Sequence, residues 1–189
     1  MTYDQDLWVF AYGSLMWDPG FEYQETRVAR LYGYHRALCI YAWTYRGTPE
    51  YPGLVLGLDA GGSCVGRAYR VLPDKGKKVL QYLDARETPD IEASKRTVDV
   101  YRKKWVRTQI LGGGAGPQKV TAVCYVADPR HQQYSGKLSF DEQAKCVLQG
   151  RGTRGSSFDY LENTIRHLDE LGIADGPLHR LWDYLRTKR

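Results

Sequence analysis

Hydrophobic and polar residues follow two different patterns along this chain, and the change comes near residue 126. Up to that point the apolar positions form short runs rich in Val, Tyr and Trp, separated by Gly, Pro and Asp. Such runs are typical of strands joined by turns. They are LWVFAYGSL, RVARLYGYHRALCIYAW, GLVLGLD, SCVGRAYRVL, TVDVYRKKWVRTQIL and KVTAVCYVAD. A curved or closed sheet is therefore expected.

Four stretches have the spacing of amphipathic helices instead. The first, KKVLQYLDARE, stops before Pro89, and the second begins at Ser139, which forms a capping-box pattern with Glu142, and ends at Gly150. The third is SSFDYLENTIRHLDELGI, ended by Gly172, and the fourth follows DGP near the C-terminus. The apolar stripes of the first, third and fourth are Val79, Leu80 and Leu83; Leu161, Ile165, Leu168 and Leu171; and Leu178, Leu181, Trp182 and Leu185.

The length and composition favour one folded domain over residues 1–189. A chain of 189 residues can bury about 70% of its unfolded surface, and we find no repeat or linker. No run approaches the ~20 apolar residues of a membrane span, and the acidic start MTYDQDLW is unlike a signal peptide. We expect a cytoplasmic protein with no membrane partner.

The cysteines and histidines do not indicate a metal site. The four cysteines are far apart in the sequence, and three lie in strand-like runs, which favours buried free thiols. The histidines share no metal-ligand spacing with one another or with the cysteines. We expect no metal and no other cofactor. The residues concerned are Cys39, Cys64, Cys124 and Cys146, and His35, His131, His167 and His179.

The formal net charge of +5 allows an acidic partner, and YRKKWVR at 101–107 has the composition of a nucleic-acid patch. No nucleic-acid motif accompanies it, so we favour an edge strand with Lys and Arg on its exposed face. We expect no nucleic-acid partner, whereas a small anionic substrate would use the same charge. LGGGAGP at 111–117 is interpreted as a hairpin loop, because it lacks the ending of a phosphate-binding loop.

Two places have the residue types of a catalytic or binding site. Gly13 and Ser14 interrupt a strand pattern in WVFAYGSLMW, which marks a bulge or a close approach of a ligand to the backbone. The segment around Ser14, Tyr-Gly-Ser-Leu, lacks the second glycine of a nucleophile elbow, so we do not expect a Ser-His-Asp hydrolase. Glu87 lies in the last turn of a predicted helix, where the helix dipole disfavours a negative charge. It is either a general base or a surface carboxylate paired with Arg86 or a lysine.

Six segments in order along the chain resemble the ChaC-type gamma-glutamylcyclotransferases, which are specific for glutathione. They are VFAYGSLMW, YRGTPEYPG at 45–53, GRAYRV at 66–71, YLDARE at 82–87, DPRHQQYSGKLSFDEQA at 128–144 and DYLENTIRHLDELGI at 159–173. The resemblance implies an α+β fold, with a small mixed, barrel-like sheet flanked by helices. It also implies cleavage of glutathione to 5-oxoproline and cysteinylglycine.

The resemblance also implies roles for particular residues. Tyr12, Gly13, Ser14 and Leu15 would line the pocket for the gamma-glutamyl group, and Glu87 would be the catalytic base. Two further residues are weaker candidates for substrate contacts. Tyr160 could place its phenol in the pocket or pack in the core, and Arg46 could bind the glycine carboxylate of glutathione.

One segment departs from the family pattern. A Tyr-Arg pair is expected a few residues after the catalytic Glu, but here Tyr101 and Arg102 follow only after a longer stretch, 88–100. Glu92, within that stretch, is a second carboxylate candidate. The alternatives are a cyclotransferase for gamma-glutamyl amino acids or gamma-glutamylamines, and a non-catalytic protein that binds glutathione or nucleic acid. The sequence does not indicate an oligomeric state.

Overall fold

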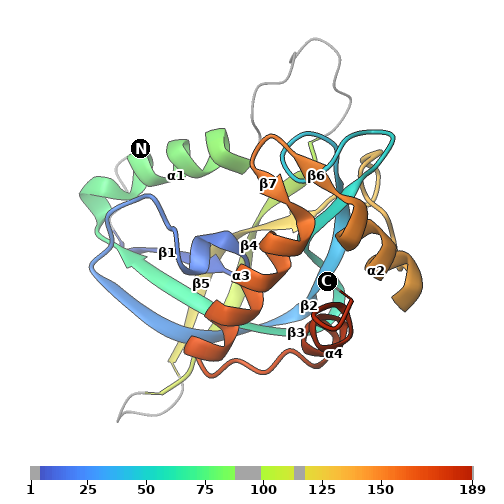
Figure 1. Ribbon diagram of the computed structural model, residues 1–189. Helices are drawn as coiled ribbons and strands as arrows, with labels where there is room; N and C mark the ends of the chain where they lie inside the picture. The colour runs from blue at the N-terminus through green and yellow to red at the C-terminus, as the bar shows by residue number, and fades with distance from the viewer. Residues whose placement is uncertain (1–4, 88–98, 113–117, 189) are drawn as a thin grey trace. The chain divides into compact units, whose positions relative to one another are not determined.

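Five strands form a closed barrel in the computed structural model, which describes residues 5–87, 99–112 and 118–188. The strands lie in the order β1-β3-β2-β4-β5 (Figure 1). β1 pairs antiparallel with β3 and parallel with β5, which confirms a mixed sheet. The strand bounds are β1 Leu7–Ala11, β2 Glu25–Ala42, β3 Gly53–Val71, β4 Tyr101–Ile110 and β5 Gln118–Ala127.

The chain divides into two compact units. The first comprises Met1–Arg36 and Leu58–Asp128, and it holds β1, β4, β5 and most of β2 and β3. The second comprises Ala37–Gly57 and Pro129–Arg189, and it holds three of the helices. A single domain over residues 1–189 stays a prediction beside this division.

All four predicted helices are confirmed. They are α1 Pro73–Glu87, α2 Phe140–Gln149, α3 Ser157–Glu170 and α4 Gly176–Leu185. The predicted capping box is present at the start of α2, where Ser139 accepts a hydrogen bond from the Glu142 N–H and the Glu142 side chain binds the Ser139 N–H. Gly172 follows the end of α3 with a φ of 64°, a conformation that favours glycine.

The connection between α2 and α3 is a small hairpin of β6, Arg151–Gly152, and β7, Gly155–Ser156. Ser156 caps α3 by accepting a hydrogen bond from the N–H of Asp159. The carboxylate of Asp159 already lies in the first turn of α3. A negative side chain in the first turn interacts favourably with the helix dipole. Its charge also repels any further anion at the N-terminus of α3.

The prediction that 101–107 forms an edge strand is corrected for β4 as a whole, because the strand also pairs with β2 at Thr108–Ile110, directly after this segment. β4 lies between β2 and β5, pairing with β2 at Ala29–Leu31 and with β5 from Tyr101↔Ala127 to Ile110↔Gln118. Closing the barrel gives every strand two neighbours, so the exposed Lys103, Lys104 and Arg107 lie on a barrel strand. The predicted β4–β5 hairpin is confirmed, although residues 113–117 of its loop lie outside the described chain.

Two further predictions concern the state of the cysteines and the presence of a membrane-spanning segment. All four cysteines are buried free thiols, as predicted. In the described ranges, none of the helices combines the length and the apolar character that a membrane crossing requires.

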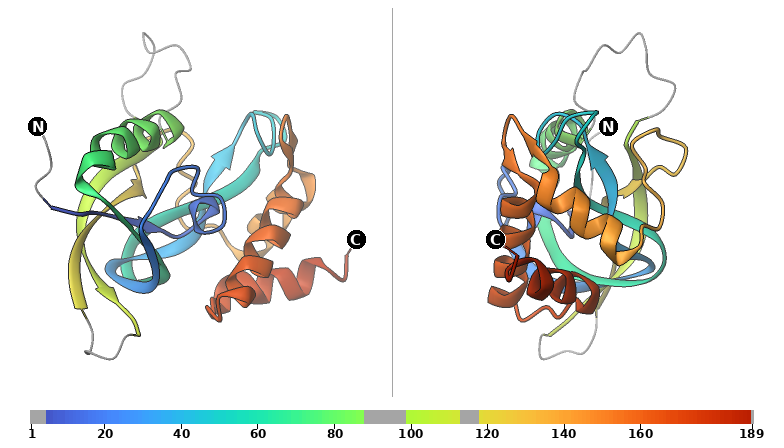
Figure 2. Two further views of the ribbon diagram at one scale, coloured as in Figure 1. Left: turned by 90° about the vertical axis from the view of Figure 1, so that its left-hand side faces the viewer. Right: turned by 45° about the vertical axis from the view of Figure 1, so that its right-hand side comes forward.

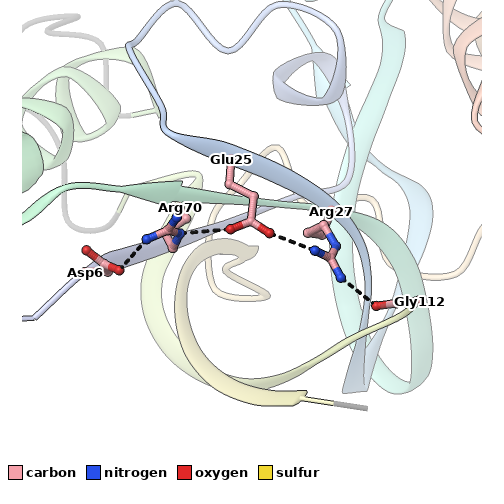
Figure 3. Close-up of polar contacts among 5 residues, drawn as sticks. All are labelled: Asp6, Glu25, Arg27, Arg70 and Gly112. Carbon is pink, nitrogen blue, oxygen red and sulfur yellow. Dashed lines mark hydrogen bonds and ion pairs between the residues drawn. The ribbon is translucent and has the colours of Figure 1, made fainter. Parts of the chain in front are cut away.

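A chain of ion pairs ties together the ends of strands in the first unit (Figure 3). Arg70 on β3 binds Asp6 and Glu25, each at 2.9 Å. Glu25 also binds Arg27 at 2.9 Å, and Arg27 donates to the carbonyl of Gly112 at 2.7 Å. These side chains are about a third exposed, and such pairs typically contribute about 0–1 kcal/mol each. Their contribution to the stability of the fold is therefore small.

Aromatic rings hold the segment between β1 and β2 against the barrel and α1. Phe21 packs edge-on against Tyr69, with ring centroids 5.6 Å apart, and against Tyr82 at 6.3 Å. Gly20 has a φ of 70°, and a Cβ at this position would overlap the phenol of Tyr82. The backbone conformation therefore favours glycine at position 20, and any larger residue would require the Tyr82 phenol to move away from Arg86.

We predict that Gly20→Ala destabilises the protein by at least about 2 kcal/mol, because backbone strain adds to a clash with Tyr82. The matched control is Gly172→Ala, whose φ of 64° is similar but whose added Cβ meets no atom within 4 Å. That control should lose only about 1 kcal/mol. Urea unfolding of both variants measures the difference. Equal losses would show that Tyr82 imposes no constraint on Gly20.

Candidate active site

A tight turn follows β1 and carries four of the predicted site residues. The strand ends at Ala11, and Ser14–Met16 forms a short 3-10 helix, η1. The predicted interruption of the strand pattern at Gly13 and Ser14 is confirmed, because the chain leaves the sheet between Ala11 and Ser14. Tyr12 and Leu15 are buried, with exposed fractions of 8% and 7%.

The hydrogen bonds of this turn leave particular N–H groups without a partner inside it. The N–H of Met16 donates to the carbonyl of Gly13 at 2.8 Å, and the N–H groups of Trp17 and Asp18 donate to the carbonyl of Ser14. The first N–H groups of any helical turn have no acceptor within the turn. Here those groups belong to Gly13, Ser14 and Leu15, which makes them available donors for a carboxylate or an oxyanion.

Side chains from the barrel strands bind the carbonyl groups of the same segment. Arg36 on β2 is 6% exposed and donates to the carbonyl of Tyr12 at 2.6 Å and to that of Val65 at 2.7 Å. Arg67 on β3 donates to the carbonyl of Met16 at 3.0 Å. The hydroxyl of Tyr69 lies 2.9 Å from the carbonyl oxygen of Leu15 and 2.8 Å from that of Met16.

These three side chains were missed by the sequence reasoning. Only Arg36 could have been noticed in the sequence, because it is a charged residue at the start of the apolar strand run RALCIYAW. A buried arginine is rare unless its donors are used. Because N–H and carbonyl groups point in opposite directions along a helical turn, anchoring the carbonyl groups to the barrel directs the N–H groups of η1 away from those anchors.

Helix α1 contacts the same turn from another side. The Arg86 side chain donates to Ser14 Oγ at 3.1 Å and to the carbonyl of Asp18 at 2.8 Å. It also donates to the hydroxyl of Tyr82 at 2.9 Å. Tyr82 and Arg86 are four residues apart, so they share one face of the helix, and this face meets the turn.

Glu87 is the last residue of α1, and only 17% of its side chain is exposed. Burial raises the pKa of its carboxyl group, and the guanidinium of Arg86, 3.9 Å away, partly opposes that rise. The alternative interpretation, a surface carboxylate paired with Arg86, is confirmed only for the pairing, because the Glu87 side chain is largely buried. A carboxyl group with a raised pKa at the end of a helix has the properties of a general base.

The surroundings of Glu87 include a buried phenol on β5. Tyr125 is 3% exposed and donates to Asp84 on α1 at 2.7 Å, and Asp84 also pairs with Lys103 on β4 at 2.7 Å. Burial raises the pKa of Tyr125, and the hydrogen bond and charge of Asp84 and the charge of Glu87 raise it further. These contacts place α1 against β4 and β5, as Figure 2 shows.

Arg46 and Tyr160 lie together in the second unit. The guanidinium of Arg46 is 5.6 Å from the centroid of the Tyr160 ring and donates to the carbonyl groups of Arg154 and Ser156. The Tyr160 hydroxyl accepts a hydrogen bond from the N–H of Leu56 at 3.3 Å. Both side chains therefore have structural partners in their own unit, and their role as substrate contacts stays a prediction.

Two other predictions concern a second carboxylate and the metal content. Glu92 and the rest of 88–98 lie outside the described residues. Within the ranges that are described, no group of three or more His, Cys, Asp or Glu side chains is arranged to hold a metal ion. Activity without a metal stays a prediction.

Curated proteins of several organisms are similar to this chain over most of its length. A glutathione-specific gamma-glutamylcyclotransferase of Escherichia coli is 31% identical over 175 residues, covering 93% of this chain and 71% of the relative. Glutathione-specific gamma-glutamylcyclotransferase 1 of Homo sapiens is 33% identical over 159 residues, covering 83% and 67%. The enzyme of Schizosaccharomyces pombe is 30% identical over 190 residues, covering 92% and 88%.

The fold is also that of solved structures. A crystal structure of a gamma-glutamyl cyclotransferase specific to glutathione from yeast superposes with a TM-score of 0.83, covering 98% of each chain at 20% identity. This similarity confirms the predicted α+β fold with a barrel-like sheet. The family model described as ChaC-like protein matches residues 7–188. With nearly the whole length matched, this chain belongs to the ChaC-like family.

Proposed function

We propose that this protein is a glutathione-specific gamma-glutamylcyclotransferase, an enzyme that converts glutathione to 5-oxoproline and cysteinylglycine. The observation that carries the proposal is the largely buried carboxyl group of Glu87 beside Arg86, which contacts the Ser14 turn. The curated relatives named for this activity support it. A non-catalytic binder would need no buried carboxylate with a raised pKa.

The chemistry of the substrate limits what the protein must supply. In a gamma-glutamyl amide the alpha-amine attacks the side-chain carbonyl, a five-membered lactam forms, and the carbon–nitrogen bond to cysteine breaks. No water is consumed. In an alpha-linked glutamyl peptide the same attack would close a three-membered ring, so the reaction selects the gamma linkage. Intramolecular attack by well-oriented groups corresponds to effective molarities of ~10⁵ M or more.

Glu87 supplies the proton transfers of the proposed reaction. Its carboxylate accepts a proton from the substrate ammonium and returns it to the leaving cysteinyl amine. The number of protons is unchanged over the cycle, so one residue acts first as base and then as acid. A raised pKa makes Glu87 a stronger base than an exposed glutamate, which the deprotonation of an ammonium requires.

The turn after β1 supplies the binding groups. The N–H groups of Gly13, Ser14 and Leu15 bind the alpha-carboxylate of the substrate or the oxyanion that forms on the side-chain carbonyl. Tyr12 lines the gamma-glutamyl pocket. Arg46 is the proposed contact for the glycine carboxylate of glutathione, and Tyr160 is a further proposed substrate contact. The reaction uses no metal, cofactor or nucleic acid, and glutathione as substrate fits a cytoplasmic enzyme.

The proposal is tested by incubating the pure protein with glutathione in buffer that contains EDTA, followed by mass spectrometry. 5-Oxoproline and cysteinylglycine in equal amounts are the expected products. Product from gamma-glutamyl amino acids or gamma-glutamylamines but not from glutathione would contradict the specificity. Product from none of these substrates would contradict the enzymatic function.

We predict that Glu87→Gln lowers kcat by a factor of ~10² to 10⁴, the usual contribution of a positioned general acid–base group. The variant keeps the shape of the side chain and removes its ability to carry a proton. Initial rates with glutathione at neutral pH measure the effect. The matched control is Glu92→Gln, which should keep its activity. If Glu92→Gln is inactive and Glu87→Gln is active, Glu87 is not the base.

We predict a pH dependence of kcat/KM and of stability that follows from the raised pKa of Glu87. Activity needs the carboxylate, so kcat/KM should rise with pH through an inflection above the ordinary glutamate value of 4.5. The folded state favours the protonated form, so the wild type loses stability as pH rises through the folded-state pKa. Glu87→Gln should therefore be more stable than wild type at pH 7, with a smaller difference at pH 4. An inflection of kcat/KM below pH 4.5 would contradict the raised pKa of Glu87, on which both expectations rest.

We predict that Gly13→Val raises KM for glutathione by about tenfold or more, because its side chain would occupy the place where the substrate approaches the backbone donors. Steady-state kinetics and a thermal melt separate binding from folding. The milder variant Gly13→Ala should show a smaller rise in KM if Gly13→Val proves unstable. An unchanged KM in a folded variant would show that the glycine serves packing alone.

A further inference from the structure

Arg86 is the residue through which the last turn of α1 is attached to the turn after β1. Its guanidinium binds Ser14 Oγ through Nη2 and the carbonyl of Asp18 through Nη1, at 3.1 and 2.8 Å. Nη1 also donates to the hydroxyl of Tyr82 at 2.9 Å. The side chain of Arg86 is 22% exposed, so water competes little for these donors. One side chain therefore holds Ser14, the first residue of η1, and Asp18, two residues after its end.

The chemistry of these contacts requires arginine. A guanidinium presents five N–H donors in a rigid plane, whereas a lysine ammonium is a single point on a flexible stem. Only the planar group can reach a hydroxyl, a carbonyl and a phenol at fixed relative positions. The phenol of Tyr82 lies beside Gly20 as well. Tyr82 therefore links the far end of the segment to the same guanidinium.

Glu87 comes directly after Arg86 and ends the helix. Consequently, any movement of Arg86 relative to the turn also moves the carboxyl group relative to Gly13, Ser14 and Leu15. Productive attack needs reacting groups placed to within a fraction of an ångström, and a misplacement of about 1 Å can reduce the rate about 100-fold. The distance between base and backbone donors is thus set in part by a residue that carries neither function.

We propose that Arg86 is the positioning residue of this site: by holding Ser14 and Asp18 it fixes the turn that binds the gamma-glutamyl group in register with the carboxyl group of Glu87. This inference rests on the function proposed above and adds to it a residue that acts through others. In this proposal Arg86 acts through the turn and Glu87 and takes no part in the proton transfer.

A second effect of Arg86 is electrostatic. Its positive charge lowers the pKa of Glu87 against the rise caused by burial. The Tyr125 phenol from β5 also feels this carboxyl group, because the charge of Glu87 raises the pKa of Tyr125. Tyr125 donates to Asp84, which pairs with Lys103. Removing the charge of Arg86 should raise the pKa of Glu87 further, while keeping the charge but losing the planar contacts should not.

Two substitutions separate these effects. Arg86→Lys keeps the charge and loses the simultaneous contacts to Ser14, Asp18 and Tyr82. Arg86→Gln loses the charge and the contacts. The matched control is Arg27→Gln, which removes an arginine that also makes one ion pair and one backbone contact in the first unit, at the Glu25 cluster of Figure 3.

The kinetic result expected is a loss of kcat by about 10- to 100-fold in both Arg86 variants. The inflection of kcat/KM against pH should stay in place in Arg86→Lys and move to higher pH in Arg86→Gln. Arg27→Gln should keep kcat within about twofold. A merely structural role would lower the amount of folded enzyme without moving the inflection.

Hydrogen exchange of the peptide that spans residues 14–20 gives a readout that does not depend on activity. Exchange should be about tenfold faster in both Arg86 variants than in wild type and unchanged in Arg27→Gln. Unchanged exchange and kcat in both Arg86 variants would overturn the proposal. If the wild type releases no 5-oxoproline from glutathione, the proposed function fails, and the exchange measurement still decides whether Arg86 holds the turn.

Discussion

The buried carboxyl group of Glu87 is the constraint on which the arrangement of the first unit depends. Two effects disfavour its ionised form, loss of water and the negative end of the α1 dipole. Arg86 offsets part of this penalty from 3.9 Å. A guanidinium placed there must have its other donors satisfied, and Ser14, Asp18 and Tyr82 accept them. The electrostatics of one carboxyl group thus determine how the neighbouring turn is attached.

The turn itself is oriented by polar groups inside the barrel wall. Arg36, Arg67 and Tyr69 bind the carbonyl groups of Tyr12, Leu15 and Met16, so these buried donors and acceptors satisfy one another. Removing Tyr69 would take its hydrogen bond away from the carbonyl of Leu15, and a buried polar group left without a partner typically costs about 1–3 kcal/mol. The carbonyl of Met16 has two donors, Arg67 and Tyr69. Burial of Arg36 is tolerated because carbonyl groups accept its hydrogen bonds, and these bonds also help to direct the N–H groups of Gly13, Ser14 and Leu15.

The sequence was most informative where a local pattern determines the structure. The capping box of Ser139 and Glu142 and the glycine that ends α3 depend on residues within one turn of each other, and both are confirmed. The mixed barrel was expected through the family resemblance. Local reasoning failed where distant segments decide. The local pattern of β4 does not reveal its pairing with β2 at Thr108–Ile110. The local pattern after β1 does not reveal that Arg36 and Tyr69, 24 and 54 residues away, bind the next carbonyl groups.

Glu87 and Glu142 show how position on a helix determines the chemistry of one residue type. Glu142 lies in the first turn of α2, where hydrogen bonds from the side chain and backbone of Ser139 lower the pKa of its carboxyl group. That side chain is exposed, and its ionised form stabilises the helix. Glu87 lies in the last turn of α1, largely buried, with its pKa raised. A carboxylate stabilised as an ion is a weak base, whereas one destabilised as an ion accepts a proton readily. Because a gamma-glutamyl substrate carries its own nucleophile, a single base of the second kind is the one titratable group that the proposed reaction requires of the protein.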